Sequence, residues 1–191
     1  MRILITGAAG MVGRKLVTRL LADGSVAGRR IEALVLHDIV EPQASAPGVA
    51  IRTIAGDLAS EGAAKALVSD RPDLIFHLAG VVSGEAEANF DLGYRVNVDG
   101  TRALYEAVRH AGHKPRLVFT SSIAVFGAPF PAVIPDDYHC TPLSSYGTQK
   151  LIGEALLTDY TRRGFFDGVG IRLPTICVRP GKPNKAASSF F

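Results

Sequence analysis

Short apolar runs alternate along the chain with longer segments in which apolar residues recur every three or four positions. The runs lie at residues 2–5, 32–38, 49–54, 73–80, 116–120 and 168–173. Short apolar runs bounded by turns are typical of buried strands, whereas the three-to-four spacing is typical of helices that face a core. Strands that alternate with helices over short connections predict an α/β fold with a doubly wound parallel sheet.

The longest segment with helical spacing covers residues 85–111. It predicts one helix with Gly112 as its C-terminal stop. Shorter helices are expected over residues 12–21 and 63–69, and a further helix is expected to begin at Ser144. In the long helix, the positions expected to be buried are Val96, Asn97, Leu104, Ala107 and Val108.

A glycine-rich turn joins the first apolar run to the first helix, with glycines at 7, 10 and 13. Three glycines at this spacing suit a tight turn, close backbone approach to a pyrophosphate and close packing of helix on strand. Met11 and Val12 would then form the first helical turn, whose amide groups face the phosphates. A merely structural glycine turn is the alternative, but the strand–turn–helix context favours dinucleotide binding.

The second and third runs each end near an acid, Asp38 and Asp57. A carboxylate at Asp38 can accept hydrogen bonds from ribose hydroxyls and would repel a 2′-phosphate, which favours NAD over NADP. Arg14 weakens this preference, and an ordinary turn aspartate is the alternative. Asp57 either meets the adenine amino group or caps the following helix.

Two polar residues fall at positions that the pattern buries. His77 lies inside the fourth run and is expected to be a core histidine with satisfied hydrogen bonds rather than a catalyst. Asn97 needs partners inside the protein, so it either braces the loop ends or orders a water near a nicotinamide. Small residues after His77, Ala79 and Gly80, would let a cofactor approach.

Tyr146 and Lys150 lie four residues apart at the start of the expected helix and share one face. An isolated phenol ionises near pH ~10, so it can act as a base only where something stabilises the phenolate, and a lysine one turn away can do so. Hydroxyls at Ser121 and Ser122 follow the fifth strand, where open α/β sheets bind ligands. A proline-rich loop over residues 128–143 separates the two groups. On the pair alone, an ordinary surface helix is the favoured interpretation, and the upstream motifs change this.

Composition narrows the class of protein. The 191 residues are 47% hydrophobic and carry a net charge of +3 with scattered basic residues, which indicates one globular domain and neither a nucleic-acid nor a membrane partner. No apolar run approaches the ~20 residues that span a bilayer. Cys140 and Cys177 fit no metal site and no disulfide framework, and the chain opens without a signal peptide, so we expect no metal and a cytoplasmic protein.

Seven short motifs stand in one order and together resemble the extended short-chain dehydrogenase/reductases, the superfamily of NAD-dependent sugar epimerases and dehydratases with a Rossmann fold. They are Thr6-Gly7-x-x-Gly10-x-x-Gly13, Asp38, Gly56-Asp57-Leu58, His77-Leu78-Ala79-Gly80, Asn97-Val98-x-Gly100-Thr101, Ser121-Ser122-x-x-Val125-Phe126-Gly127 and Tyr146-x-x-x-Lys150.

The resemblance implies a role for each group of residues. Ser122 would hold the substrate hydroxyl, Tyr146 would remove its proton, and Lys150 would bind the nicotinamide ribose and lower the pKa of the phenol. Ser121 would assist in the substrate site. The residues implied to contact NAD are Gly7, Gly10, Met11, Val12, Gly13, Asp38, Asp57, Leu58, Ala79, Gly80, Asn97, Tyr146, Lys150, Pro174, Thr175 and Ile176.

Within the superfamily, residues 144–150, 171–176 and 179–181 are most similar to a branch that oxidises the C2 hydroxyl of the four-carbon sugar acid D-erythronate with NAD. Three residues depart from the usual pattern: Gly80 replaces alanine, Phe126 replaces tyrosine and Thr175 replaces asparagine. A sugar acid brings a carboxylate that needs donors or a cation. Ser83, Ser121 and Thr175 could orient that carboxylate, and Arg179 could bind it with its planar fork. The alternative is that Arg179 only caps the sheet or pairs with a loop acid.

The family normally continues into a C-terminal substrate domain, so we expect residues 1–191 to be its dinucleotide-binding domain alone. The resemblance further implies a homodimer. Two other functions remain open: a nucleotide-sugar epimerase or dehydratase with the same triad, and a non-enzymatic dinucleotide sensor, which would not need Ser122, Tyr146 or Lys150.

Overall fold

A computed structural model of the chain describes residues 1–135 and 137–176. Its centre is a six-stranded sheet in the order β5-β4-β1-β6-β7-β8, with every neighbouring pair parallel. The strands are β1 (Arg2–Thr6), β4 (Ala33–Asp38), β5 (Ala50–Ala55), β6 (Leu74–His77), β7 (Arg116–Ser122) and β8 (Asp167–Leu173). The sequence-based prediction of a doubly wound parallel sheet is confirmed, because the chain runs outward from β1 first in one direction and then in the other.

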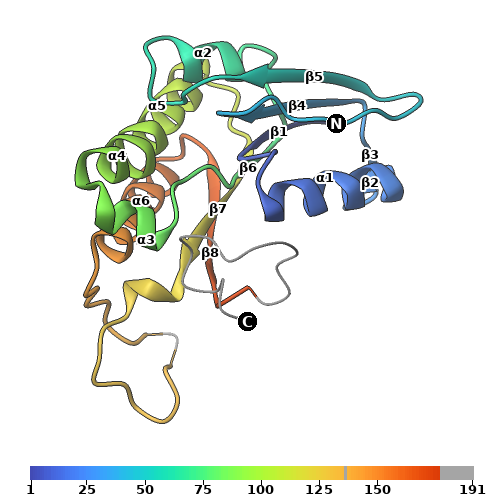
Figure 1. The fold of residues 1–191 in the computed structure, drawn as a ribbon. Helices are drawn as coiled ribbons and strands as arrows, with labels where there is room; N and C mark the ends of the chain where they lie inside the picture. The colour runs from blue at the N-terminus through green and yellow to red at the C-terminus, as the bar shows by residue number, and fades with distance from the viewer. Residues whose placement is uncertain (136, 177–191) are drawn as a thin grey trace.

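Helices cover both faces of the sheet, with α2 (Ala63–Val68), α5 (Thr101–Ala111) and α6 (Ser145–Arg162) on one side and α1 (Met11–Asp23) on the other (Figure 1). Side chains alternate along β1, so Leu4 packs under α2 and α5 while Ile3 and Ile5 pack under α1. All three are fully buried. The strand ends carry the loops that could form a site, and the two packed layers hold those ends in place.

The prediction of one helix over residues 85–111 is wrong. The segment divides into α3 (Ser83–Ala88), α4 (Phe90–Tyr94), a π-helical turn η1 (Arg95–Gly100) and α5. Asn89 causes the break, because its backbone is extended and its side chain accepts a hydrogen bond from the amide of Leu92 at 3.0 Å. Leu104 and Val108 are fully buried as expected, and Gly112 ends α5 in a left-handed conformation.

Other differences from the expected elements are small. The fourth strand ends at His77 rather than continuing to residue 80, and Val96 and Ala107 are only half-buried. The pattern also missed a short hairpin of β2 (Ser25–Val26) and β3 (Arg29–Arg30) after α1. These strands have only two residues each, so they show no apolar alternation from which they could have been predicted.

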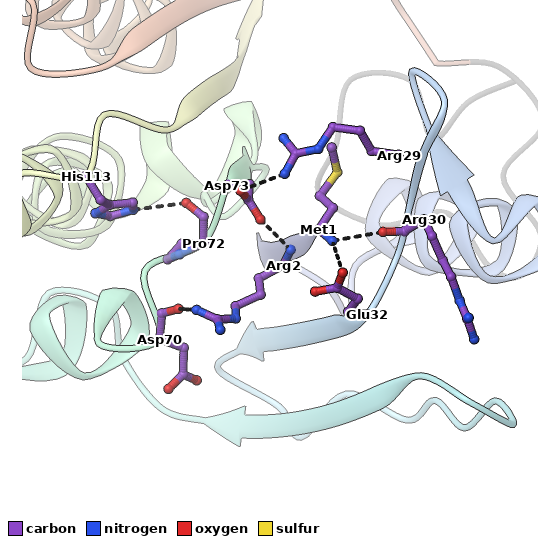
Figure 2. A network of polar contacts seen from close by, with 9 residues as sticks. All are labelled: Met1, Arg2, Arg29, Arg30, Glu32, Asp70, Pro72, Asp73 and His113. Carbon is purple, nitrogen blue, oxygen red and sulfur yellow. Dashed lines mark hydrogen bonds and ion pairs between the residues drawn. The ribbon is translucent and has the colours of Figure 1, made fainter.

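A polar network joins residues at the amino ends of the strands, which is the end of the sheet away from the glycine turn. Figure 2 shows this network. The carboxylate of Asp73 accepts hydrogen bonds from the amide of Arg2 at 2.7 Å and from the guanidinium of Arg29 at 2.9 Å. The amino group of Met1 donates to the carbonyl of Arg30 at 2.9 Å and pairs with Glu32 at 3.2 Å. The network therefore joins β1, the β3 hairpin strand and the loop before β6.

Candidate active site

The glycine turn after β1 is packed too tightly for side chains at two of its three glycines. Gly7 has a φ of +77°, and a Cβ atom there would lie 2.6 Å from the amide nitrogen of Ala79. A Cβ atom at Gly13 would lie 2.1 Å from the carbonyl oxygen of Gly7. Gly10 begins α1 without a side-chain cap, so the first amide groups of the helix have no capping side chain. These are the conditions under which a helix start can accept a phosphate.

A cavity of about 770 Å³ lies at the carboxyl ends of β1, β4 and β5. It brings together seven of the residues proposed for the cofactor, which come from four separate stretches of the sequence. They are Gly7, Gly10, Asp38, Asp57, Leu58, Ala79 and Gly80. Arg14 and Glu41 line the same cavity.

The two acids of this cavity are already partly engaged by the protein. Asp38 ends β4 and accepts hydrogen bonds from the amides of Ala9 at 2.9 Å and Ile39 at 2.7 Å. Asp57 accepts from the amide of Ala59 at 2.9 Å and also pairs with Arg95 of η1. The alternative prediction that Asp57 caps the following helix is wrong, because α2 has Gly62 as its N-cap and no side chain caps it. Asp57 instead bonds Ala59 in the turn before that helix, and its carboxylate also lines the cavity.

A second cavity, of about 470 Å³, lies at the carboxyl ends of β6, β7 and β8. It brings together the proposed catalytic residues Ser122, Tyr146 and Lys150 with other residues predicted for the site, namely Val12, Ser83, Ser121, Pro174, Thr175 and Ile176. Leu78, Gly80 and Val81 line both cavities. The two cavities therefore adjoin at these residues.

Three predicted cofactor residues line neither cavity: Met11, Gly13 and Asn97. Gly13 acts instead through its missing side chain, which permits close packing on Gly7. Asn97 is 2% exposed and contacts the backbone behind the cavity wall. Arg179 lies outside the described residues.

Helix α6 presents the tyrosine and the lysine because its first turn is fixed at two points. Ser144 is the N-cap, and its hydroxyl accepts a hydrogen bond from the amide of Gly147 at 3.0 Å. Gly147 packs on the turn after β7, where a Cβ atom would lie 2.1 Å from the carbonyl oxygen of Ala124. The sequence pattern did not predict the role of Gly147, because its neighbours in sequence give no sign of the contact with Ala124.

Lys150 lies behind the ring of Tyr146, with Nζ 5.6 Å from the ring centroid. Burial raises the pKa of Tyr146, and the Ser122 side chain opposes this only in part. Burial lowers the pKa of Lys150 to about 8. Its ammonium donates to the carbonyl of Thr120 at 3.0 Å. In this arrangement the phenol is held neutral by its surroundings, in contrast to the lowered pKa that the family resemblance implies.

His77 is a fully buried residue whose two ring nitrogens both have partners, as the sequence pattern predicted. Thr101 donates its hydroxyl proton to the carbonyl of Asn97 at 2.7 Å and so accepts from Nε2 of His77 at 2.9 Å. Nδ1 then accepts from the hydroxyl of Thr6 at 2.7 Å. Burial lowers the pKa of His77 to about 3, which keeps the ring neutral.

A charged pair beneath the second cavity was also missed by pattern reasoning. Arg172 of β8 forms two hydrogen bonds with Glu154 of α6, at 2.9 and 2.7 Å, and its guanidinium lies 4.9 Å from the ring centroid of Phe126. Burial raises the pKa of Glu154, but Arg172 and Ser121 together more than offset this and hold it below its ordinary value. Glu154 follows Lys150 by four residues, so helical spacing could have placed it on the same face.

Two further features bear on the kind of protein. Among the described residues, no helix is long and apolar enough to cross a membrane. In the same part of the chain, metal-binding side chains do not gather in groups of three or more.

Residues 3–190 match the model of the NAD dependent epimerase/dehydratase family. A D-erythronate dehydrogenase from Cupriavidus necator is 52% identical over the whole chain, which covers 60% of that protein. The crystal structure of a nucleoside-diphosphate-sugar epimerase from Agrobacterium tumefaciens is 62% identical, with a TM-score of 0.95 over the whole chain and 57% of that structure. A uronate dehydrogenase from Agrobacterium tumefaciens, complexed with NAD, is 32% identical, with a TM-score of 0.76 over 96% of this chain and 63% of that one. The chain spans about 60% of the length of the curated relatives it matches.

Proposed function

The chain belongs to the NAD-dependent epimerase/dehydratase family, and we propose that it forms the cofactor-binding and catalytic part of an NAD-dependent sugar-acid dehydrogenase. The reaction proposed is oxidation of the C2 hydroxyl of D-erythronate to the 2-oxo acid. The observation that carries this proposal is the convergence of Ser122, Tyr146 and Lys150 on a cavity that shares lining residues with the one at the glycine turn. The D-erythronate dehydrogenase at 52% identity supports the choice of substrate.

The dinucleotide would lie along the larger cavity, with its phosphates at the start of α1 and its adenosine ribose at Asp38. The tight packing at Gly7 and Gly13 keeps side chains out of that path. When bound, NAD supplies the hydride acceptor. Residues 1–191 would accordingly form one dinucleotide-binding domain.

The chain's own residues would handle the proton. Ser122 orients the substrate hydroxyl, and Tyr146 accepts its proton through the phenolate form. Burial disfavours that form, so a positive charge must stabilise it, and Lys150 is the cation that lines the described part of this cavity. The ammonium lies behind the ring in a position to do so.

The substrate carboxylate needs donors or a cation of its own. Ser83, Ser121 and Thr175 line the cavity and could orient it. We retain Arg179 as the proposed bidentate partner, because it follows shortly after the last cavity residue in sequence. Phe126 in place of the family's usual tyrosine makes this cavity less suited to a large polar sugar.

A nucleotide-sugar epimerase is the second candidate. It is favoured by the Agrobacterium tumefaciens structure that carries that description. An epimerase uses the same serine, tyrosine and lysine but regenerates its NAD in each cycle. The two functions therefore differ in whether NADH accumulates.

The deciding experiment is to incubate the full-length protein with NAD and either D-erythronate or a nucleotide sugar, and to follow NADH absorbance. We expect NADH with the sugar acid and none with the nucleotide sugar. Product formation from the nucleotide sugar without net NADH would establish the epimerase instead.

Tyr146→Phe provides the internal test of the mechanism. It keeps the ring and loses only the proton acceptor, so turnover should fall by about 100-fold or more while the Kd for NAD changes little. Activity within a few fold of the parent protein would exclude Tyr146 as the base.

A further inference from the structure

Gln149 is a completely buried polar residue between Tyr146 and Lys150 on α6. Its Oε1 accepts a hydrogen bond from Nδ2 of Asn97 at 2.7 Å. On its other side, α4 contributes Gly93, where a Cβ atom would lie only 2.6 Å from Nε2. The side chain therefore packs against α4 on one side and bonds to η1 on the other.

Asn97 connects Gln149 to Val81, which lies in the wall shared by the two cavities. Its Oδ1 accepts from the amide of Val81 at 2.9 Å, and its Nδ2 donates to the carbonyl of the same residue at 3.2 Å. Both polar groups of Val81 are thereby occupied. Val81 lines both cavities, so its position affects the path from one to the other.

Gly80 shows how closely the same group approaches the catalytic lysine. A Cβ atom at Gly80 would lie 2.8 Å from Oδ1 of Asn97 and 3.4 Å from Nζ of Lys150. Alanine, the usual residue of the family here, would therefore have to displace the amide of Asn97. The absence of a side chain at Gly80 therefore leaves room for the Asn97 amide in the position to which Gln149 holds it.

We propose that Gln149 is a positioning residue that acts through Asn97 to set the cavity wall at Gly80 and Val81 against which NAD binds. The proposal rests on the proposed binding of NAD in these cavities. Without the Oε1 acceptor, one N–H of the buried Asn97 amide loses its partner, and the amide must turn or shift to find another. Any such shift moves the backbone of Val81, because Asn97 holds both of its polar groups.

The test replaces Gln149 in the full-length protein and measures NAD affinity by calorimetry together with the thermal unfolding midpoint. Gln149→Met keeps the length but removes the acceptor, and it should weaken NAD binding by about ten-fold. Gln149→Glu keeps an acceptor oxygen for Asn97 and should stay within about three-fold of the parent protein. Thr158→Ala, which removes an exposed hydroxyl bonded only to the carbonyl of Glu154 on the same helix, is the control and should change nothing.

A double-mutant cycle shows whether Gln149 acts through Asn97. In an Asn97→Ala background, Gln149→Met should cost less than about two-fold in NAD affinity, since the residue that transmits the effect is gone. Parent-like affinity in Gln149→Met, or a full ten-fold loss in the Asn97→Ala background, would overturn the proposal. If Gln149→Met does not unfold cooperatively, Gln149→Glu decides, and a ten-fold loss there would also overturn it. A parent protein that binds NAD but does not oxidise sugar acids would refute the proposed substrate and leave this test intact.

Discussion

Burial alone does not make a polar side chain catalytic, as His77 and Lys150 show. Both are buried, and burial lowers the pKa of each. His77 has hydroxyl partners on both ring nitrogens and faces the core, so its neutrality serves packing. Lys150 lines the cavity beside Tyr146, where a buried ammonium can act on a ligand. The surroundings of each residue therefore decide its role.

The buried charge of Lys150 should lower the free energy of unfolding, and Lys150→Met, which removes the charge, should show by how much. The folded pKa of about 8 lies below the ordinary value of 10.5, so below pH 8 the folded state carries an ammonium that burial disfavours. The unfolded chain binds more protons between pH 8 and 10.5, and the stability of the parent protein must rise with pH across that window. Lys150→Met should unfold a few degrees higher than the parent at pH 7, although it loses the bond to Thr120 and should lose activity.

Thermal unfolding of both proteins from pH 7 to 10.5 checks this prediction. The advantage of the variant should shrink as the pH rises through the window, because the parent lysine becomes neutral. A constant difference at every pH would mean that packing, and not charge, separates the two proteins.

Asp38 should set the preference for NAD over NADP. Asp38→Asn keeps an acceptor for the amide of Ala9 and removes the charge that would repel a 2′-phosphate. Arg14 lines the same cavity and could then attract the phosphate. We expect the ratio of the two Kd values to move toward NADP by about ten-fold or more. An unchanged ratio would leave Asp38 as a turn residue.

At the scale of elements, α6 joins the proposed catalytic residues to the sheet through contacts spread along its length. Gly147 packs on the turn after β7, Gly153 packs on the ring of Phe119, and Glu154 binds Arg172 of β8. A Cβ atom at Gly153 would lie 2.6 Å from that ring. The close approach of α6 to β7 is thus permitted by small residues, and it brings Tyr146 up to Ser122.

The start of α6 depends on its cap. Ser144→Ala removes the hydroxyl that accepts from Gly147, which should destabilise the protein by about 1 kcal/mol and loosen the turn that carries Tyr146. Ser144→Thr keeps the hydroxyl and should restore both stability and turnover. Chemical denaturation and kcat measured on both variants check the prediction, and equal behaviour of the two would show that the hydroxyl is irrelevant.

At the scale of the whole molecule, the two ends of the parallel strands have different roles. The carboxyl ends of the strands bear the loops of both cavities, whereas the amino ends are joined by the network around Asp73 (Figure 2). Two salt bridges at that edge allow a comparison. Asp73 accepts from a backbone amide and from Arg29, whereas Asp70 pairs with Arg52 alone and is 52% exposed.

Asp73→Asn should lower the thermal midpoint at pH 7, and Asp70→Asn should not change it measurably, because exposed single pairs contribute little. The amide of Arg2, and to a smaller extent Arg29, lowers the pKa of Asp73 below its ordinary value of 3.8. The contribution of a carboxyl with a lowered pKa is present above that ordinary value and is lost as the pH falls through the folded pKa. Unfolding curves of Asp73→Asn and the parent should therefore converge below pH 4. A difference that persists there would not come from the charge.

The sequence by itself determined the parallel sheet and the strand ends at which most of the proposed site residues lie. Glycines at fixed spacing, strand-end acids and a tyrosine–lysine pair are local signals, and a parallel sheet brings the carboxyl ends of its strands to one edge. Each of these features depends only on neighbouring residues and on chain direction. The same locality explains why the start of α6 near Ser144 could be placed from sequence.

Only the tertiary structure decided what depends on residues far apart in the chain. The predicted helix over 85–111 breaks at Asn89, Gly147 meets Ala124, and Gln149 reaches Asn97 across 52 positions. The pKa of Tyr146 likewise depends on how deeply the folded chain buries the phenol. Burial and contact are properties of the packed molecule, because they arise only when separate segments exclude water together.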